Sequence, residues 1–374
     1  YEILRCLVGS EMCIRDRDYA KQVTKLADYS GVAITVSNDY EINDTAKQTY
    51  LTNVLQSYGA DAYKQVTDRD TVADGDYVKV DYTGYKDGKA FDGGSATDVL
   101  LDVTNNSQVG GSSFIDGFTK PLIGAKVGDK VKGDVTFPED YGNDDLNGQT
   151  VTFEYTVKGI YSADPVALAD MTDEQVNTVF GKAGVTTNAQ LTTQIEKDLK
   201  QQLYSAEVDK IKSYMIENST VEIPDEYLQA RLNEYIASFT KENVKDGQTL
   251  KKYLKSNYNM TVDQATEKWK ENLTDQIKTE FIFGLIAEKE NIKMDDDAFN
   301  SYVDYIVSAS NGQFSKASEV YKYFGSGHKD EGKTYLKNQY LVNKAIDTVT
   351  EKANVTFEDG SAAPDTSSGS ADAE

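Results

Sequence analysis

The sequence predicts an α+β protein of several domains, in which a strand-rich part precedes an all-α part. Its 374 residues are enough for two or three domains. Between residues 72 and 161, apolar and polar residues alternate, which is the period of half-buried antiparallel strands. Between residues 162 and 357, apolar residues recur every three or four positions, which is typical of helices with one buried face.

The composition excludes several classes of function. Hydrophobic residues make up 39% of the chain, so packed cores are expected. The net charge of −23 argues against binding to nucleic acid or to anionic membranes, because both need basic patches. No apolar run approaches the roughly 18 residues of a transmembrane helix. With one histidine, His328, and with Cys6 and Cys13 both near the start, we expect no metal site and no cofactor.

The first part of the chain is predicted to contain two short segments before the strand-rich domain. Residues 1–17 lack a periodic pattern, a starting Met and the layout of a signal peptide, so we interpret them as an artefactual leader resembling a translated adapter sequence. Residues 18–71 are predicted to be a connecting segment. It should contain a short strand at residues 32–36 and a helix from about Asp44 to Ala62, capped by Asn43 or Asp44.

The predicted strand-rich domain covers residues 72–161. Strands are expected around Val78 and Val80 and at residues 99–103, 131–137 and 151–157. The pair Asp87-Gly88 is a hairpin signal, because a tight turn between twisted strands needs residues that accept positive φ. The domain is therefore expected to be an antiparallel sheet.

The predicted helical domain covers residues 162–357. Pro224 is well placed as a first helical residue, and Thr261 with Gln264 forms a capping box. The acidic run at residues 295–297 is best explained as a helix cap. Residues 358–374 consist mainly of Ser, Ala, Gly and Asp without a basic residue, which predicts a disordered acidic tail.

Two motifs carry the strongest functional signal. Residues 78–93 read V-K-V-D-Y-T-G-Y-K-D-G-K-A-F-D-G, and residues 137–142 read F-P-E-D-Y-G. Between them, residues 114–118 read F-I-D-G-F. In this order the motifs resemble the FKBP family of peptidyl-prolyl isomerases. The resemblance implies an antiparallel half-barrel around a short helix, and isomerase activity without a cofactor.

The same resemblance implies a set of site residues. The strand tyrosine, the Phe-Asp pair and the later aromatic positions match the family's catalytic positions. Ile115 would offer its backbone N–H to a substrate carbonyl, the Tyr141 hydroxyl would hold another carbonyl, and Phe118 would form the floor. The implied catalytic residues are Tyr82, Phe91, Asp92, Ile115, Tyr141 and Phe153, and the implied substrate-binding residues are Val99, Leu101, Phe114 and Phe118.

The helical part carries a second resemblance. The segments V-E-I-P-D-E-Y-L from Val221, F-G-L-I-A-E from Phe283 and E-V-Y-K-Y-F from Glu319 follow the order seen in the C-terminal domain of the bacterial chaperone trigger factor. This implies helical arms that hold unfolded or nascent proline-containing chains. The family's ribosome-binding domain has no counterpart in this sequence, so ribosome docking is doubtful.

The leading functional hypothesis is therefore a bacterial folding chaperone that isomerises X-Pro bonds. The alternative is a holdase with a degenerate isomerase domain, because the turn at residues 104–113 is long and Pro121 should shorten the helix and could displace Phe118. A third hypothesis is a surface protein that binds ligands or mediates adhesion. We expect an extracytoplasmic location, like that of lipid-anchored foldases of Gram-positive bacteria, with the cytoplasm as the alternative.

Overall fold

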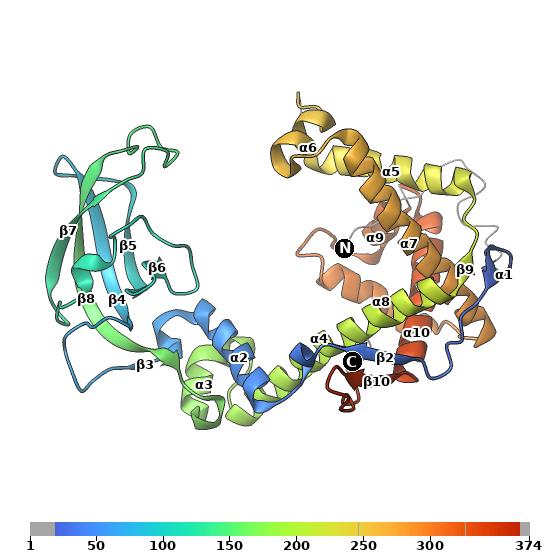
Figure 1. Cartoon of the computed structure of the whole chain (residues 1–374), viewed down its shortest axis with the longest axis horizontal. Coiled ribbons are helices and arrows are strands. Elements are labelled where there is room, and N and C mark those ends of the chain that lie inside the picture. The colour runs from blue at the N-terminus through green and yellow to red at the C-terminus, as the bar shows by residue number, and fades with distance from the viewer. Residues whose placement is uncertain (1–18, 246, 326, 367–374) are drawn as a thin grey trace. The chain divides into compact units, whose positions relative to one another are not determined.

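The computed structural model describes residues 19–366 except 246 and 326, and it describes no side chains at 59–61 and 165. It divides the chain into two compact units (Figure 1). Unit 1 comprises residues 1–39 and 201–374, and unit 2 comprises residues 40–200. The predicted leader lies outside the described residues. Both the predicted connecting segment and the predicted helical domain are shared between the two units, and the boundaries drawn from the sequence stay a prediction.

Unit 2 contains an antiparallel six-stranded sheet with the order β3-β8-β4-β5-β6, and β7 pairs with β8. Its strands are β3 (Tyr63–Gln65), β4 (Asp76–Lys86), β5 (Lys89–Asp102), β6 (Ser107–Gln108), β7 (Lys130–Thr136) and β8 (Thr150–Pro165). Asp87 and Gly88 join β4 to β5 with φ values of 50° and 75°, as a tight hairpin requires. The predicted strands and hairpin are confirmed, and β5 is much longer than expected.

One face of this sheet carries a hydrophobic core. Val78 and Val80 of β4 are buried, as are alternate residues of β8 from Val151 to Val157. The short helix against this face is η3 (Lys120–Leu122), a single 3-10 turn. Pro121 lies at its start and cannot donate a backbone hydrogen bond, which limits the helix as expected. Phe118 nevertheless stays buried in this core.

A layer of short helices completes unit 2. It contains α2 (Asp44–Leu55), η2 (Gln56–Ala62), η4 (Leu168–Asp170), α3 (Asp173–Phe180), η5 (Gly181–Ala183) and the first part of α4 (Asn188–Asn218). Asn43 caps α2 by accepting the Ala46 N–H at 2.9 Å. The predicted helix over residues 44–62 changes to 3-10 geometry at Gln56. There the Ser57 hydroxyl donates a hydrogen bond to the Val54 carbonyl at 2.7 Å.

Unit 1 is mainly helical. It contains the rest of α4 together with α1 (Tyr19–Gln22), α5 (Asp225–Asn243), α6 (Leu250–Tyr258), α7 (Val262–Lys289), α8 (Asp296–Ser308), α9 (Ala317–Phe324) and α10 (Lys329–Glu351). The capping box of Thr261 and Gln264 and the cap at Asp295 are confirmed. Pro224 is the N-cap of α5, whereas it was predicted to be the first helical residue, which is one position further along. Within the described part of the chain, no helix is both long and apolar enough to span a membrane.

Two small strand pairings in unit 1 were not predicted. β1 (Val23–Lys25) pairs antiparallel with β9 (Thr220–Val221), and β2 (Ala33–Val36) pairs in parallel with β10 (Asn354–Phe357). The remaining short element, η1 (Asn38–Tyr40), lies at the junction of the two units. Both pairings join segments that are far apart in the sequence, which is why local periodicity does not reveal them.

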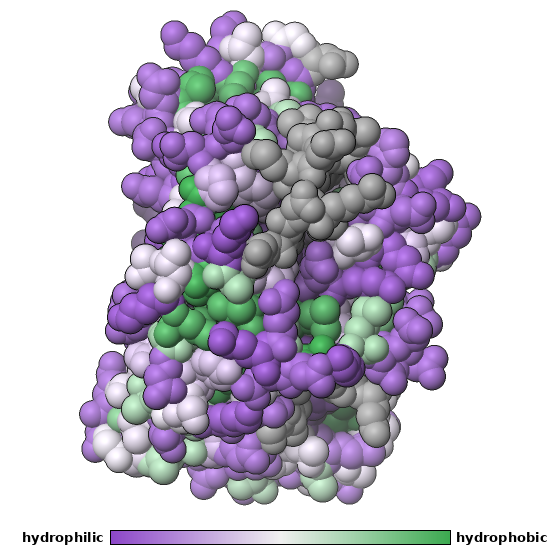
Figure 2. Space-filling view, turned by 90° about the vertical axis from the view of Figure 1, so that its right-hand side faces the viewer, coloured by the Kyte–Doolittle hydropathy of each residue, from purple (hydrophilic) through white to green (hydrophobic). Residues whose placement is uncertain are grey.

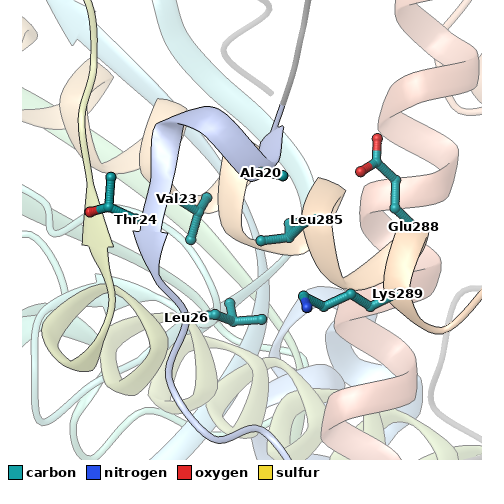
Figure 3. A pocket seen from close by; sticks show the side chains of 7 residues that line it. All are labelled: Ala20, Val23, Thr24, Leu26, Leu285, Glu288 and Lys289. Carbon is teal, nitrogen blue, oxygen red and sulfur yellow. The ribbon is translucent and has the colours of Figure 1, made fainter.

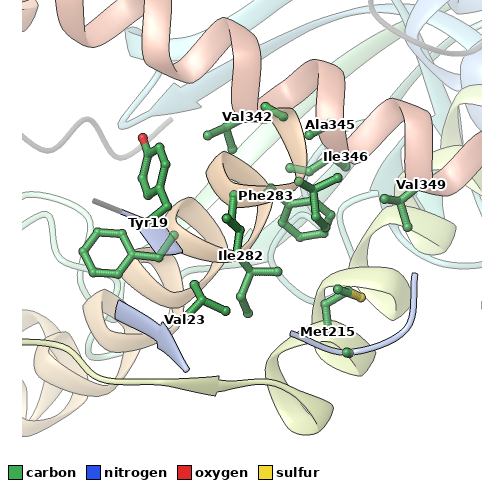
Figure 4. Packing of buried hydrophobic residues seen from close by; sticks show 14 of the residues in the cluster. Tyr19, Val23, Met215, Ile282, Phe283, Val342, Ala345, Ile346 and Val349 are labelled. Atoms are coloured by element: carbon green, nitrogen blue, oxygen red, sulfur yellow. The ribbon is translucent and has the colours of Figure 1, made fainter. Parts of the chain in front are cut away.

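The core of unit 1 is built around α7 and α10 (Figure 4). The α7 residues from Glu280 to Ala287 are all buried, so this end of α7 is surrounded by other elements. Ile282 and Phe283 pack with Val342 and Ile346 of α10 in the same cluster.

Residues 358–366, which follow β10, are mostly exposed, but some of them are hydrogen-bonded to other parts of unit 1. The Ala363 N–H donates to the Val355 carbonyl at 3.1 Å, and the Thr366 hydroxyl donates to the carboxylate of Glu207 on α4. The disordered acidic tail expected over residues 358–374 stays a prediction. Residues 367–374 lie outside the described part of the chain.

Candidate functional site

The sheet of unit 2 carries a group of packed aromatic rings, here called the aromatic cluster. Its members are Tyr82, Phe91, Phe114, Phe118, Phe137, Phe153 and Tyr155. Phe114 and Phe118 stack with ring centroids 4.2 Å apart. Tyr82 and Phe153 meet Phe118 edge to face at 5.0 and 4.8 Å. Such geometries are favourable because the positive edge of one ring faces the negative face of another.

Exposure divides the cluster into a base and a rim. Phe118 and Phe153 are buried, with exposed fractions of 2% and 4%. Tyr82, Phe91 and Phe114 are only half-buried, so parts of their side chains remain accessible. The cluster therefore offers a partly exposed aromatic surface above a closed hydrophobic base.

Two glycines, one on the neighbouring strand β4 and one on its own strand β5, leave space for the Phe91 ring. A Cβ atom at Gly84 of β4 would lie 2.6 Å from the Phe91 ring and 2.7 Å from the Phe153 ring. A Cβ atom at Gly94 of β5 would also lie 2.6 Å from the Phe91 ring. The V-x-Y-T-G and F-D-G-G segments thus place small residues where this ring needs space.

Two phenolic hydroxyls lie near the rim. Burial raises the pKa of Tyr82 above its ordinary value, and the nearby Tyr141 adds to this shift. Tyr141 itself is 49% exposed, and its ring contacts Phe137 at 4.6 Å. Tyr82 is therefore a neutral hydrogen-bond donor throughout the physiological pH range.

The other predicted site residues differ in their surroundings. Ile115 is half-buried, and no acceptor for its backbone N–H is found in the described part of the chain. Asp92 is exposed, and among the described residues its carboxylate has no hydrogen bond or ion pair. On β5, Val99 pairs with Val80 and is half-buried, whereas Leu101 is fully buried. Ile115 thus offers a free donor beside the rings, whereas Asp92 is open to water.

Tyr155 is a component of the site that the sequence-based list omitted. Its side chain is 1% exposed, and its hydroxyl donates to the Phe118 carbonyl at 2.6 Å. It thereby fixes the backbone beneath the buried base. The sequence could have identified Tyr155 by its position on the same face of the alternating strand as Phe153 and Val157.

No cofactor site is evident among the described residues, in which no group of three or more His, Cys, Asp or Glu side chains could hold a metal ion. Unit 1 has a hollow of about 420 Å³ (Figure 3), lined by Ala20, Val23, Thr24, Leu26, Leu285, Glu288 and Lys289. All of these residues belong to unit 1, so the hollow is no part of the aromatic cluster. It has no group of side chains arranged for catalysis.

The two parts of the chain match two known families. Residues 69–158, which carry the aromatic cluster, match the family of FKBP-type peptidyl-prolyl cis-trans isomerases. Residues 186–351 match the family described as bacterial trigger factor protein C-terminus. The molecule is thus an FKBP-type domain joined to a helical chaperone domain. It is a trigger-factor-like protein, in agreement with the resemblance seen in its motifs.

Relatives along most of the chain support this assignment. The trigger factor of Agathobacter rectalis is 28% identical over 330 residues, covering 87% of this chain and 69% of the relative. The trigger factor of Clostridium botulinum strain Eklund 17B is 29% identical, covering 74% of this chain and 62% of the relative. That of Staphylococcus saprophyticus is 27% identical, covering 93% and 75%. A solved structure of the trigger factor chaperone covers 87% of this chain and 72% of its own chain, at 18% identity and with a TM-score of 0.46.

The relatives correct one expectation. An extracytoplasmic location was predicted, but the matched relatives are trigger factors, which are cytoplasmic chaperones. The prediction was wrong because it relied on a comparison with shortened, exported forms and not on any residue of this chain.

Proposed function

We propose that this chain isomerises X-Pro bonds in nonnative polypeptides that its helical unit holds. The observation that carries this proposal is the aromatic cluster, with its buried base, its half-exposed rim and the free Ile115 N–H beside it. This arrangement joins an apolar surface for a proline ring to a donor for an adjacent carbonyl.

The chemistry requires no acid, base or metal. The planar X-Pro amide is held by resonance, and a trans amide must cross a barrier of about 18–20 kcal/mol to rotate. The twisted state has less charge separation than the planar one, so an apolar surface favours it. Each 1.4 kcal/mol of such preference accelerates the reaction by about tenfold.

Each predicted site residue receives a role in this proposal. Phe118 and Phe153 form the base on which the proline ring rests. Tyr82, Phe91 and Phe114 form the walls, and Val99 and Leu101 support them from β5. The Ile115 N–H and the Tyr141 hydroxyl bind the carbonyls on either side of the rotating bond. Asp92, the only acidic side chain among these residues, would contact the substrate at the exposed edge of the aromatic cluster.

The helical unit offers apolar contacts for an unfolded chain. Tyr258 and Tyr305 are each 54% exposed, and Tyr235, Phe239 and Trp269 are half-buried neighbours on α5 and α7. On the face shown in Figure 2, hydrophobic side chains form separate patches among hydrophilic ones. Tyrosine rings tolerate water while contacting varied apolar segments, which suits weak binding of many sequences.

A holdase with an inactive isomerase domain is the second candidate. The exposure of Asp92 and of Tyr141 favours it, because polar groups that are open to water position a substrate less well than enclosed ones. The two candidates differ in one measurable property, which is the rate of X-Pro isomerisation.

A protease-coupled assay with an X-Pro peptide tests the proposal on the full chain. We expect acceleration by the wild type and a reduction of about tenfold or more in Tyr141→Phe, which loses a donor to a substrate carbonyl, and in Phe153→Leu, which loses the ring beneath the proline. Tyr85→Phe is the matched control, because Tyr85 is a half-buried tyrosine on the same strand as Tyr82 but outside the cluster. A folded wild type that suppresses aggregation without accelerating isomerisation would establish the holdase instead.

A further inference from the structure

The long turn after β5 contains an asparagine, Asn106, whose side-chain amide forms several hydrogen bonds. The Asn106 Nδ2 group donates to the carbonyls of Phe114 at 3.0 Å and Ile115 at 2.9 Å. Its Oδ1 accepts the Thr119 N–H at 3.0 Å and lies 3.1 Å from the Thr119 hydroxyl. An amide side chain has two N–H donors and two acceptor lone pairs, so both donors and at least one lone pair of Asn106 are used.

These bonds fix both ends of the segment that carries part of the aromatic cluster. The Asn106 carbonyl also accepts the Phe114 N–H at 2.9 Å. At the other end, Thr119 is 2% exposed, and its hydroxyl also lies 3.1 Å from the Val103 carbonyl. Residues 114–119 include Phe114 of the rim, Ile115 with its free N–H, and Phe118 of the base.

The turn itself is anchored within unit 2. Val109 is buried in a cluster that includes Leu51 and Leu55 of α2. Gly110 lies so close to η2 that a Cβ atom there would be 2.1 Å from the Gln56 carbonyl oxygen. The turn thus connects the helical layer of unit 2 to the segment beneath the aromatic rim.

We propose that Asn106 is a positioning residue for X-Pro isomerisation, whose amide sets the Ile115 N–H and the Phe114 and Phe118 rings relative to the bound proline. This inference rests on the proposed isomerase activity and identifies what orders its site. The long turn then contributes to the site and does not impair it. A positioning role matters because misplacing groups around a reacting bond by about 1 Å costs on the order of 100-fold in rate.

The test compares two neighbouring asparagines in the full chain. Asn106 has φ 51°, which glycine adopts freely, so Asn106→Gly removes the amide without backbone strain. We expect kcat/KM for an X-Pro peptide to fall about 10- to 100-fold. Asn105→Gly is the control, since Asn105 is exposed and its amide donates to Asp102 at 2.8 Å. Its kcat/KM should change by less than about twofold.

A second variant separates hydrogen bonding from shape. Asn106→Asp keeps the side-chain size, the tolerance of positive φ and both acceptor contacts. It places an oxygen opposite the carbonyls of Phe114 and Ile115, where the native amide donates. We expect a loss at least as large as that of Asn106→Gly. Wild-type activity in either variant would overturn the proposal.

Amide hydrogen exchange distinguishes positioning from general stability. In Asn106→Gly, the amides of Phe114 and Thr119 should lose protection by at least about tenfold, while those of β4 and β8 keep theirs. Equal loss of protection throughout the sheet would overturn the proposal, because Asn106 would then only stabilise the fold. An inactive wild type would remove the proposed function itself. The exchange data would then show separately whether Asn106 orders this segment.

Discussion

The aromatic side chains of the two units are arranged in different ways. In the sheet of unit 2, the seven rings of the aromatic cluster are contiguous and lie over a common base, while other rings of unit 2, such as Tyr63 and Phe180, belong to a separate core. In unit 1, they are distributed among separate clusters, and Tyr258 and Tyr305 lie largely in water. A fixed set of rings suits one precise reaction, whereas scattered rings suit many weak contacts. The comparison suggests that substitutions should have concentrated effects in unit 2 and dispersed effects in unit 1.

The largest expected effect follows from removing the base of the cluster. Phe118→Ala should lower the free energy of unfolding of the sheet by about 3–5 kcal/mol, because it removes a buried ring that four other rings contact. Hydrogen exchange of the β4 and β8 amides would measure this loss. A loss below about 1 kcal/mol would show that the cluster tolerates rearrangement, contrary to the proposed precision.

A smaller effect concerns the thermal stability of unit 1, which should depend on the pH through the carboxyl group of Glu207. Burial raises the pKa of Glu207, the Thr366 hydrogen bond offsets part of this shift, and the charge of Asp365 adds to it. A carboxyl group whose pKa is raised by folding stabilises the fold fully below its unfolded pKa, and this contribution is lost as the pH rises through the folded pKa. Glu207→Gln keeps an acceptor for Thr366 and should therefore raise the unfolding midpoint at pH 7 by a few degrees.

The difference between Glu207→Gln and the wild type should vanish near pH 4. Thermal unfolding between pH 4 and pH 7.5 would measure it, with the sheet of unit 2 as an internal reference. The raised pKa values of Tyr82 and Tyr155 lie above this range, so these residues stay neutral throughout. A constant difference at every pH would disprove the titration of Glu207 as its cause.

The smallest effect is expected on the surface of the helical unit. Tyr305→Ser should change the free energy of unfolding by less than about 0.5 kcal/mol, since the side chain is 54% exposed. Suppression of aggregation of an unfolded client should fall by less than about twofold, because many side chains share the contact. Abolished suppression would instead indicate a single dominant client site.

Strand periodicity was sufficient to predict most of the sheet of the FKBP-type domain. Val78, Val80 and the alternating residues of β8 are buried because a strand with one buried face must alternate. The aromatic positions followed from family resemblance, and the structure brings most of them together, although their roles stay a proposal. The effect of Pro121 on the helix was also predictable, because a missing N–H is a local property.

The role of Asn106 could not be predicted. Its partners lie 8 to 13 residues further along an irregular turn, and no periodic pattern describes such a path. Tyr155 was omitted for a different reason, since any aromatic residue on a strand can serve simply as core. The β2–β10 pairing could not be predicted from local sequence patterns, because paired residues such as Thr35 and Thr356 are 321 positions apart. Non-local pairing leaves no mark on local sequence.

That pairing has a consequence for the order in which the protein is made. Unit 1 begins before unit 2 and ends after it, so β2 emerges early and has no partner until β10 has been translated. At about 5–20 residues per second, 321 residues take roughly 15–60 s. The sheet that carries the aromatic cluster, by contrast, is complete once Pro165 has emerged. The FKBP-type domain can therefore mature while the other half of the protein is still unfinished.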